Sequence, residues 1–157
     1  MNQHEYTLEK ISYSRKEDCR IMESVFKHWF KNPKELNFFS SDLLFPFRFK
    51  NFLQKYNNRA ISYVLKHQDW IIGHISFQKK NGSIFISHLF IESKYRKLGL
   101  ATIMLNEIEK FSSELSAKSI SVKIISKNIK AIKLFKKLSY KIRKRPKSGF
   151  LEFLKNV

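Results

Sequence analysis

A basic turn with one glycine stands between two apolar segments, and its residue types suit the binding of a phosphate group. The turn reads Arg96-Lys-Leu-Gly-Leu-Ala101. Gly99 permits a left-handed backbone, and Ala101 lets another group approach the main chain closely. A helix that begins here would point free N–H groups and the positive end of its dipole outward, beside two cations. The turn therefore predicts an anion site that a pyrophosphate would fit.

The segments on either side must position this turn. Residues 84–91 are rich in β-branched and aromatic side chains, which is typical of a buried or half-buried strand. After the turn, apolar residues recur at helical spacing, at Leu100, Ile103, Met104, Ile108 and Phe111. The sequence thus predicts a strand, a basic turn and a helix. It contains neither of two common phosphate loops, Gly-x-x-x-x-Gly-Lys-Ser/Thr and Gly-x-Gly-x-x-Gly.

The length and composition predict one domain, residues 1–157, with a sizeable core. No apolar run approaches transmembrane length and no signal-peptide core follows the polar start, so we expect no membrane contact and a cytoplasmic location. The single Cys19 excludes an internal disulfide and is expected to be a small apolar residue on a helix. The five His residues lack ligand spacing with carboxylates or cysteine, so no metal is expected.

The formal net charge of +18 is unevenly distributed. Residues 1–42 hold seven Lys/Arg and seven Asp/Glu, and the rest of the chain holds 24 and 6. A positive field around the predicted phosphate site would attract a cofactor that carries several phosphates. It would equally attract nucleic acid. Lys, Asn, Ile and Phe are all frequent, so an AT-rich genome also accounts for part of the charge.

The residues before the turn predict alternating strands and helices. Tyr6 to Tyr13 reads as a strand, and Ser14 would cap a helix to about Phe30 that ends before Pro33. Its expected buried stripe is Ile21, Val25, Phe26 and Trp29. Ser40 or Ser41 would start a short helical turn, and a further helix would run from about residue 48 to 56. Strands are expected at 61–66, 70–77 and 83–91, the last two joined by the hairpin signal Asn81-Gly82.

The residues after the predicted helix at the turn continue the same alternation. Residues 119–125 read as a strand parallel to 83–91, since a helix crossover joins the two. Asn128 then opens a helix to about Leu138, and residues 140–145 and 150–154 read as a closing antiparallel pair. The inward side chains of that helix are expected to be Ile129, Ile132, Phe135 and Leu138, and the outward ones Lys130, Lys133 and Lys137.

The pattern Arg96-x-x-Gly99-x-Ala101 resembles the acyl-CoA-binding signature Gln/Arg-x-x-Gly-x-Gly/Ala of the GNAT superfamily of N-acetyltransferases. A strand ending in Leu89-x-Ile91 precedes it, and Asn128-x-x-Ala131, Phe135 and Ser139-Tyr140 follow at the distances that the family uses. The resemblance covers residues 60 to 145 well and the earlier part in outline. It implies an α+β (mixed α/β) fold: a GNAT-like central mixed, mostly antiparallel sheet of six to seven strands with helices on both faces.

The resemblance implies acetyl-CoA as the cosubstrate and assigns residues to its parts. Main-chain groups of Leu89, Phe90 and Ile91 would bind the pantetheine arm and the thioester carbonyl, where this strand splays from its parallel neighbour. Asn128 has the position of an amide that contacts the cofactor arm, and it equally suits a helix N-cap. Lys97, with Lys130 or Lys133, would contact the 3′-phosphate. The pyrophosphate would lie on Arg96, Lys97, Leu98, Gly99, Leu100, Ala101 and Thr102.

Acetyl transfer to an amine needs a neutral amine, a stabilised oxyanion and a protonated leaving thiolate. The candidates for the general base are His88 and His74, which a hairpin would bring together, and Glu92 at the end of the strand. For each histidine a purely structural role is the alternative. Phe135 stands where many family members carry a tyrosine that protonates the thiolate, and phenylalanine has no proton to donate. The acid would then be water, a serine such as Ser126, or the substrate ammonium.

The sequence therefore predicts an acyl-CoA-dependent N-acetyltransferase that acts on a primary amine of a small molecule or a protein. By the resemblance, the aromatic-rich residues 37–49 would form part of one wall of the acceptor groove. One alternative is a CoA-binding GNAT-fold protein without efficient transfer, which Phe135 keeps open. A second is a basic nucleic-acid-binding module that uses Lys136-Lys137 and residues 141–147. The sequence predicts neither the identity of the acceptor nor an oligomeric state.

Overall fold

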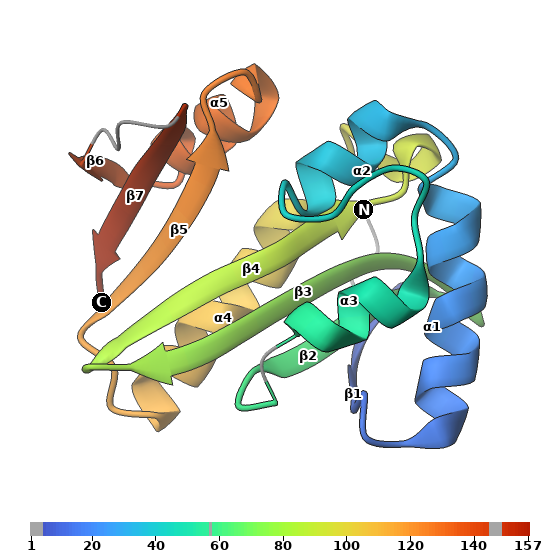
Figure 1. The fold of residues 1–157 in the computed structure, drawn as a ribbon. Helices are drawn as coiled ribbons and strands as arrows, with labels where there is room; N and C mark the ends of the chain where they lie inside the picture. The colour runs from blue at the N-terminus through green and yellow to red at the C-terminus, as the bar shows by residue number, and fades with distance from the viewer. Residues whose placement is uncertain (1–4, 57, 145–148) are drawn as a thin grey trace. The chain divides into compact units, whose positions relative to one another are not determined.

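A computed structural model of the chain describes residues 5–56, 58–144 and 149–157 (Figure 1). The described residues form one mixed sheet of seven strands, in the order β1-β2-β3-β4-β5-β7-β6, together with five α-helices. This arrangement confirms the mixed α+β fold that the sequence predicts. Within the same residues, no helix combines the length and the apolar character that a membrane crossing requires.

Three helices follow the first strand, and three consecutive strands then lead to α4, in ranges close to the predicted ones except for α2. Their bounds are β1 (Tyr6–Ile11), α1 (Lys16–Trp29), α2 (Pro33–Phe39), α3 (Phe49–Lys55), β2 (Ile61–His67), β3 (Trp70–Lys80), β4 (Ser83–Ile91), the 3₁₀ turn η2 (Ser93–Tyr95), α4 (Leu100–Glu114), β5 (Ser119–Ile125), α5 (Ile129–Lys137), β6 (Lys141–Lys144) and β7 (Phe150–Asn156).

The chain divides into two compact units. The first unit consists of residues 1–76 and 88–96, and the second consists of residues 77–87 and 97–157. Strands β3 and β4 contribute residues to both units. The predicted phosphate turn begins at this division, because Arg96 belongs to the first unit and Lys97 to the second.

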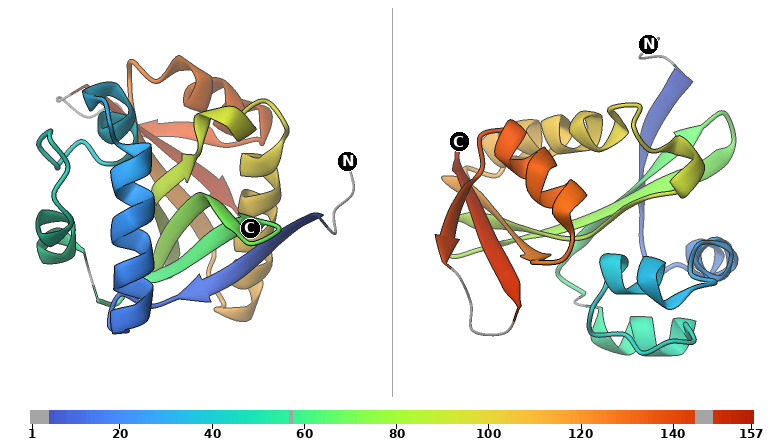
Figure 2. Two further views of the ribbon diagram at one scale, coloured as in Figure 1. Left: turned by 90° about the vertical axis from the view of Figure 1, so that its right-hand side faces the viewer. Right: turned by 90° about the horizontal axis from the view of Figure 1, so that it is seen from above.

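The first unit is built around aromatic side chains from α1, α2 and α3, and the ribbons of these three helices lie close together in Figure 2. Phe26 of α1 is fully buried, and its ring contacts many of the others. β1 pairs antiparallel with β2, from Tyr6 opposite His67 to Ile11 opposite Ser62. The aromatic partners of Phe26 are Trp29, Phe30, Phe39, Phe47, Phe49 and Phe52, with ring centroids 5.1–6.2 Å away.

Two predictions about α1 are wrong in detail. Arg15, not Ser14, is the N-cap, and the Ser14 hydroxyl bonds the Ser12 hydroxyl at 2.6 Å instead of a helix N–H. The buried stripe contains Met22 in place of Ile21, which is 37% exposed. Phe26 and Trp29 are buried as predicted.

Helix α2 is absent from the sequence prediction, although its start carries a clear signal. Asn32 is the N-cap, its side chain accepts a hydrogen bond from the Glu35 N–H at 2.9 Å, and Pro33 occupies the first turn. This is the pattern of a capped helix with proline at its first position. Ser40 ends this helix, and its carbonyl also accepts a hydrogen bond from the Leu43 N–H at 3.4 Å, which closes a single turn at the predicted place.

In the second unit, β5 pairs parallel with β4 on one side and antiparallel with β7 on the other. Both hairpin-turn residues, Asn81 and Gly82, have positive φ (53° and 78°), as the predicted two-residue turn requires. Helix α4 contributes Phe111, whose ring stacks on Phe77 of β3 with centroids 5.8 Å apart. In α5 the predicted inward position of Ile129 is wrong, because this side chain is 61% exposed.

Candidate active site

The predicted phosphate turn leads directly into α4. The backbone turns left-handed at Lys97 (φ 65°) and again at Gly99 (φ 76°), which is the N-cap of the helix. Gly99 has no side chain to accept hydrogen bonds from the first helical N–H groups, which also lack partners within the helix. A Cβ added at Gly99 would meet no described atom within 4 Å. The start of this 15-residue helix therefore offers main-chain donors, a favourable dipole and room for an anion.

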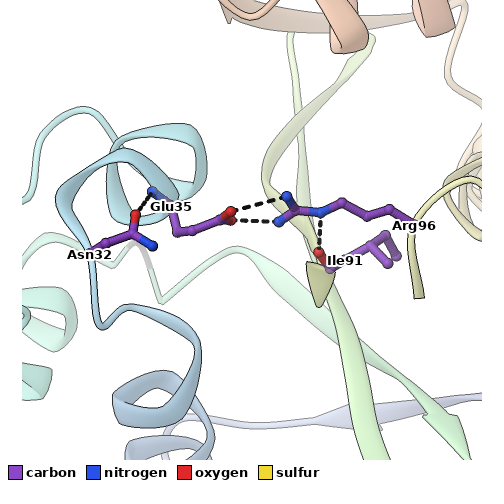
Figure 3. Close-up of polar contacts among 4 residues, drawn as sticks. All are labelled: Asn32, Glu35, Ile91 and Arg96. Atoms are coloured by element: carbon purple, nitrogen blue, oxygen red, sulfur yellow. Dashed lines mark hydrogen bonds and ion pairs between the residues drawn. The ribbon is translucent and has the colours of Figure 1, made fainter. Parts of the chain in front are cut away.

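Arg96, the first residue of the signature, is held by its own unit (Figure 3). Its guanidinium nitrogens donate to both carboxylate oxygens of Glu35, at 3.1 and 2.5 Å, and its Nε donates to the Ile91 carbonyl at 2.8 Å. The guanidinium also lies 5.1 Å from the centroid of the Phe90 ring. Such a bidentate, stacked arrangement fixes an arginine side chain firmly. In this structure the charge of Arg96 is therefore neutralised by Glu35, and not offered to a phosphate.

The predicted pantetheine strand is the last part of β4. Leu89 is partly exposed, and Phe90 and Ile91 are buried. The pairing of β4 with β5 runs from Ser83 to Ile86, so among the described residues it ends before this segment. The end of pairing agrees with the predicted splay of the two strands. Gly73 of β3 allows the close approach of β4, since a Cβ there would lie 2.9 Å from the Ile91 Cδ1 and 3.3 Å from the Phe90 carbonyl oxygen.

His74 is buried completely and both of its ring nitrogens are engaged. Nδ1 lies 2.8 Å from the His88 carbonyl oxygen, and Nε2 lies 2.7 Å from the hydroxyl of Tyr13. Burial lowers the pKa of this imidazole to about 3, and the hydrogen bond to the His88 carbonyl only partly opposes that effect. His74 is therefore neutral at physiological pH.

His88 lies beside it in the same unit, in β4, with an unusual positive φ of 51°. Its Nδ1 is buried without a hydrogen-bond partner in the described part of the chain. Burial lowers the pKa of His88 to about 4, whereas the charge of Asp42 acts in the opposite direction. The neighbours of its ring are aromatic: Phe39, Phe52 and Tyr56, with centroids 4.9, 5.4 and 6.3 Å away. The neutral imidazole carries one lone pair that can accept a proton, and the same burial raises the free-energy cost of the charged form.

Glu92, the third candidate base, follows β4 directly. Its side chain is only 15% exposed, and its carboxylate accepts a hydrogen bond from His28 Nε2 at 3.1 Å. Its backbone N–H donates to the Ile72 carbonyl at 2.8 Å, which fixes it next to β3. The pairing of a carboxylate with an exposed imidazole is an arrangement that can accept and pass on a proton.

The two signature residues of α5 have structural partners in the second unit. Asn128 is the N-cap, and its side chain accepts from the Ala131 N–H at 3.2 Å. The Phe135 ring is buried and contacts Tyr140, at 5.0 Å edge-on, and Phe153, at 6.3 Å. The Tyr140 hydroxyl is buried without a described partner, and burial raises its pKa. Phe135 thus packs in an apolar cluster of its own unit.

Cations are available on the second unit for further phosphate contacts. Lys97, Lys130 and Lys133 are all exposed, and none of them belongs to an ion pair in the described residues. Across the same described ranges, no group of three or more His, Cys, Asp and Glu side chains is arranged to hold a metal ion.

The sequence and the fold together define the class of protein. The model of the acetyltransferase (GNAT) family matches residues 15–140, which include the turn, β4, α4 and all of α5. This chain therefore belongs to the GNAT acetyltransferase family. A search of the curated proteins gives no match.

Solved structures share the fold at low sequence identity. The GNAT domain of S. lividans PAT is 10% identical and superimposes with a TM-score of 0.79, covering 100% of this chain and 99% of that chain. The ribosomal-protein-S18-alanine N-acetyltransferase from Escherichia coli is 12% identical, with a TM-score of 0.71 and coverages of 97% and 94%. The PaiA N-acetyltransferase from Thermoplasma acidophilum, solved in complex with coenzyme A, is 12% identical, with a TM-score of 0.73 and coverages of 97% and 99%. At such identities the likeness concerns the fold.

Sequence reasoning missed three residues that contact the candidate site residues. Glu35 neutralises Arg96, Tyr13 bonds His74, and His28 bonds Glu92. Glu35 had a readable signal, because it lies three residues after the N-cap Asn32 at the start of a helix. Tyr13 and His28 carry no such signal, since their partners are about 60 residues away in the sequence.

Proposed function

We propose that this protein transfers an acetyl group from acetyl-CoA to a primary amine of a small molecule or a protein, within a single functional domain. The observation that carries the proposal is the turn at Lys97 and Gly99, which opens α4 with uncapped N–H groups within the family's acyl-CoA signature. The chemistry of these donors fits a pyrophosphate, because several main-chain N–H groups and a helix dipole act on one dianionic group.

The proposed contacts with acetyl-CoA are mostly made by the main chain. Residues Lys97 to Thr102 would bind the pyrophosphate, with exposed Lys97, Lys130 or Lys133 for the 3′-phosphate. Leu89, Phe90 and Ile91 would bind the pantetheine arm, since their strand is no longer paired with β5. Arg96 would contribute its backbone, while its side chain holds Glu35. Asn128 keeps its cap, and its side-chain N–H₂ is free to donate to the same arm.

The proton of the amine must leave before or during attack on the thioester carbonyl. We assign this role to His88 first and to the Glu92–His28 pair second. His88 has an unpaired, buried Nδ1 and precedes the proposed thioester-binding residues directly. His74 is a poorer candidate, because taking up a proton at Nε2 would break its bond with Tyr13. The neutral amine adds to the thioester carbonyl and forms the C–N bond, and the resulting oxyanion then collapses with cleavage of the C–S bond. The departing thiolate takes a proton from water or from the nitrogen of the added amine, since Phe135 has none to give.

A coupled assay of thiol release tests the proposal. Acetyl-CoA is mixed with the protein and a panel of primary amines: polyamines, amino-sugar, aminoglycoside and aromatic amines, and peptides with free N-termini. We expect release of CoA thiol above the hydrolysis rate with at least one amine, and an acetylated amine of the corresponding mass. Binding of CoA with no thiol release across the panel would favour the alternative of a non-transferring CoA-binding protein.

Two substitutions assign the base once an acceptor is found. His88→Asn removes the imidazole but keeps a residue type that tolerates a positive φ. Glu92→Gln removes the carboxylate charge and keeps the shape. Loss of a general base lowers kcat by about 10²–10⁴-fold. We expect that loss in His88→Asn and a smaller one in Glu92→Gln, and the reverse order would move the role to Glu92.

A further inference from the structure

β4 contains a left-handed residue that needs an explanation. His88 has a φ of 51°, in the middle of a strand whose other residues are extended. A non-glycine residue adopts this conformation only where the surroundings hold it there. Such residues mark β-bulges, which end the pairing of a strand or redirect it. The pairing of β4 with β5 ends two residues earlier, at Ile86.

The carbonyl group of this residue is bound by a side chain. His74 Nδ1 lies 2.8 Å from the His88 carbonyl oxygen, in a part of the molecule where His74 has no exposed surface. A carbonyl oxygen can only accept, so Nδ1 must be the protonated nitrogen of the His74 ring. Nε2 then carries the lone pair and accepts the hydrogen bond of the Tyr13 hydroxyl at 2.7 Å. The opposite tautomer would place two lone pairs against each other at 2.8 Å.

We propose that His74 is a positioning residue that, in the Nδ1–H tautomer required by the His88 carbonyl and matched by the Tyr13 hydroxyl, holds this carbonyl and so fixes the main chain from which Leu89 to Ile91 continue. The inference rests on the proposed function, in which these three residues bind the acetyl-CoA arm. The peptide group between His88 and Leu89 includes both the held carbonyl and the Leu89 N–H. A shift of the carbonyl therefore moves the first of the proposed main-chain donors directly.

The tautomer is measured by long-range ¹H–¹⁵N NMR of protein labelled at its histidine rings. We expect one ring, assigned by its loss in His74→Asn, with a protonated Nδ1, an unprotonated Nε2 and no titration between pH 5 and 8. In Tyr13→Phe the Nε2 signal of this ring should shift, whereas in Tyr6→Phe it should not. Tyr6 is the matched control, because it stacks on His67, with centroids 5.1 Å apart. A protonated Nε2 in the wild-type ring would overturn the proposal.

The functional consequence is measured with a pair of variants of the same size. The side-chain amide of His74→Asn places a donor near the former Nδ1 position, and His74→Leu removes the donor. Loss of one hydrogen bond predicts a KM for acetyl-CoA about tenfold higher in His74→Leu than in His74→Asn, with the KM for the amine unchanged. A general loss of folded protein would instead lower kcat at an unchanged KM.

The melting temperature of each variant, measured in the same buffer, reports folding separately. Equal KM values for acetyl-CoA in folded His74→Leu and His74→Asn would refute the positioning role. Should the wild-type protein not bind acetyl-CoA at all, the proposed function fails, whereas the NMR result still decides the tautomer. The two failures are therefore distinguishable.

Discussion

The two compact units differ sharply in the chemistry of their side chains. The first unit contains all five histidines and both tryptophans, with 14 Lys/Arg against 9 Asp/Glu. The second unit contains no histidine and has 17 Lys/Arg against 4 Asp/Glu. All of the histidines thus belong to one unit, and the excess cations belong to the other. Transfer from acetyl-CoA to an amine needs both kinds of group, one to accept a proton and one to bind phosphates.

A second contrast concerns two places in the chain, the end of β4 in the first unit and the start of α4 in the second. In the first unit, side chains bind main-chain groups, as His74 binds the His88 carbonyl and Arg96 binds the Ile91 carbonyl. At the start of α4 in the second unit, the N-cap Gly99 makes no side-chain hydrogen bond. Around β4, main-chain carbonyls are thus bonded by side chains, whereas the first N–H groups of α4 have no side-chain cap and are available to a ligand.

The largest effect on cofactor binding is expected from Gly99→Glu in the second unit. The substitution places a carboxylate where the phosphates are proposed to bind, so the Kd for CoA should rise more than about 100-fold, which corresponds to about 2.7 kcal/mol. Gly149→Glu is the matched control, since Gly149 has a similar φ of +78° and a Cβ added there would meet no described atom within 4 Å. Calorimetric titration of both variants measures the difference. Equal weakening in the two variants would mean that the added charge acts at long range.

Acid should destabilise the first unit before the second. Burial lowers the pKa of His74 to about 3 and that of His88 to about 4, below the ordinary value of 6.5. The unfolded chain therefore takes up protons first as the pH falls, and stability that is present above pH 6.5 is lost between pH 6.5 and about pH 3–4. Within this range, each histidine with such a lowered pKa reduces the free energy of unfolding by about 1.4 kcal/mol for every unit by which the pH falls.

Reporters for the two units are available in the chain itself. Trp29 and Trp70 both belong to the first unit, so their fluorescence follows its unfolding. Amide hydrogen exchange of β5 and β7 follows the second unit. Between pH 7 and 4.5, we expect the urea midpoint of the tryptophan transition to fall by more than the exchange protection of β5 does. Equal loss of stability in both units would show that they unfold as one.

A smaller effect, on the stability of the fold, is expected from substitutions at Phe135 and at its neighbour Tyr140. Phe135→Tyr would add a hydroxyl to a buried apolar cluster, which costs about 1–3 kcal/mol if no partner is found. Tyr140→Phe is the complementary change, because it removes a buried hydroxyl that has no described partner, and it should leave stability unchanged or increase it. Thermal melts of the two variants measure these costs. Faster thiol release by a stable Phe135→Tyr protein would instead place the ring beside the thioester.

The smallest effect is expected from breaking the ion pair that holds Arg96. Glu35→Gln keeps the shape of the side chain but loses a partly buried charge pair, so we expect a cost of about 1 kcal/mol. Glu17→Gln breaks the fully exposed pair with Arg20 and serves as the control, with no measurable change expected. Affinity for CoA should change less than about threefold in both variants. A gain of affinity in Glu35→Gln would show that Glu35 competes with the phosphates for Arg96.

Much of the fold could be predicted from local patterns. The hairpin at Asn81-Gly82, the parallel strand β5 and the turn at Gly99 follow from residue types at fixed spacing. Errors arose where tertiary packing decides the outcome, as with exposed Ile21 and Ile129, whose apolar character predicts burial on a helix face. The candidate site was only partly predictable, because its hydrogen-bond partners are distant in the sequence. Tyr13 and His74 are 61 residues apart, and no local pattern around either residue predicts their contact.

Isothermal titration of the wild-type protein with acetyl-CoA and with CoA tests the central proposal most directly. We expect one equivalent of each to bind, with an affinity that falls as the salt concentration rises, because the phosphates contact N–H groups and lysines. The Gly99→Glu variant should show no heat under the same conditions. Absence of binding by the wild-type protein at millimolar cofactor would contradict the proposal that the chain binds acetyl-CoA.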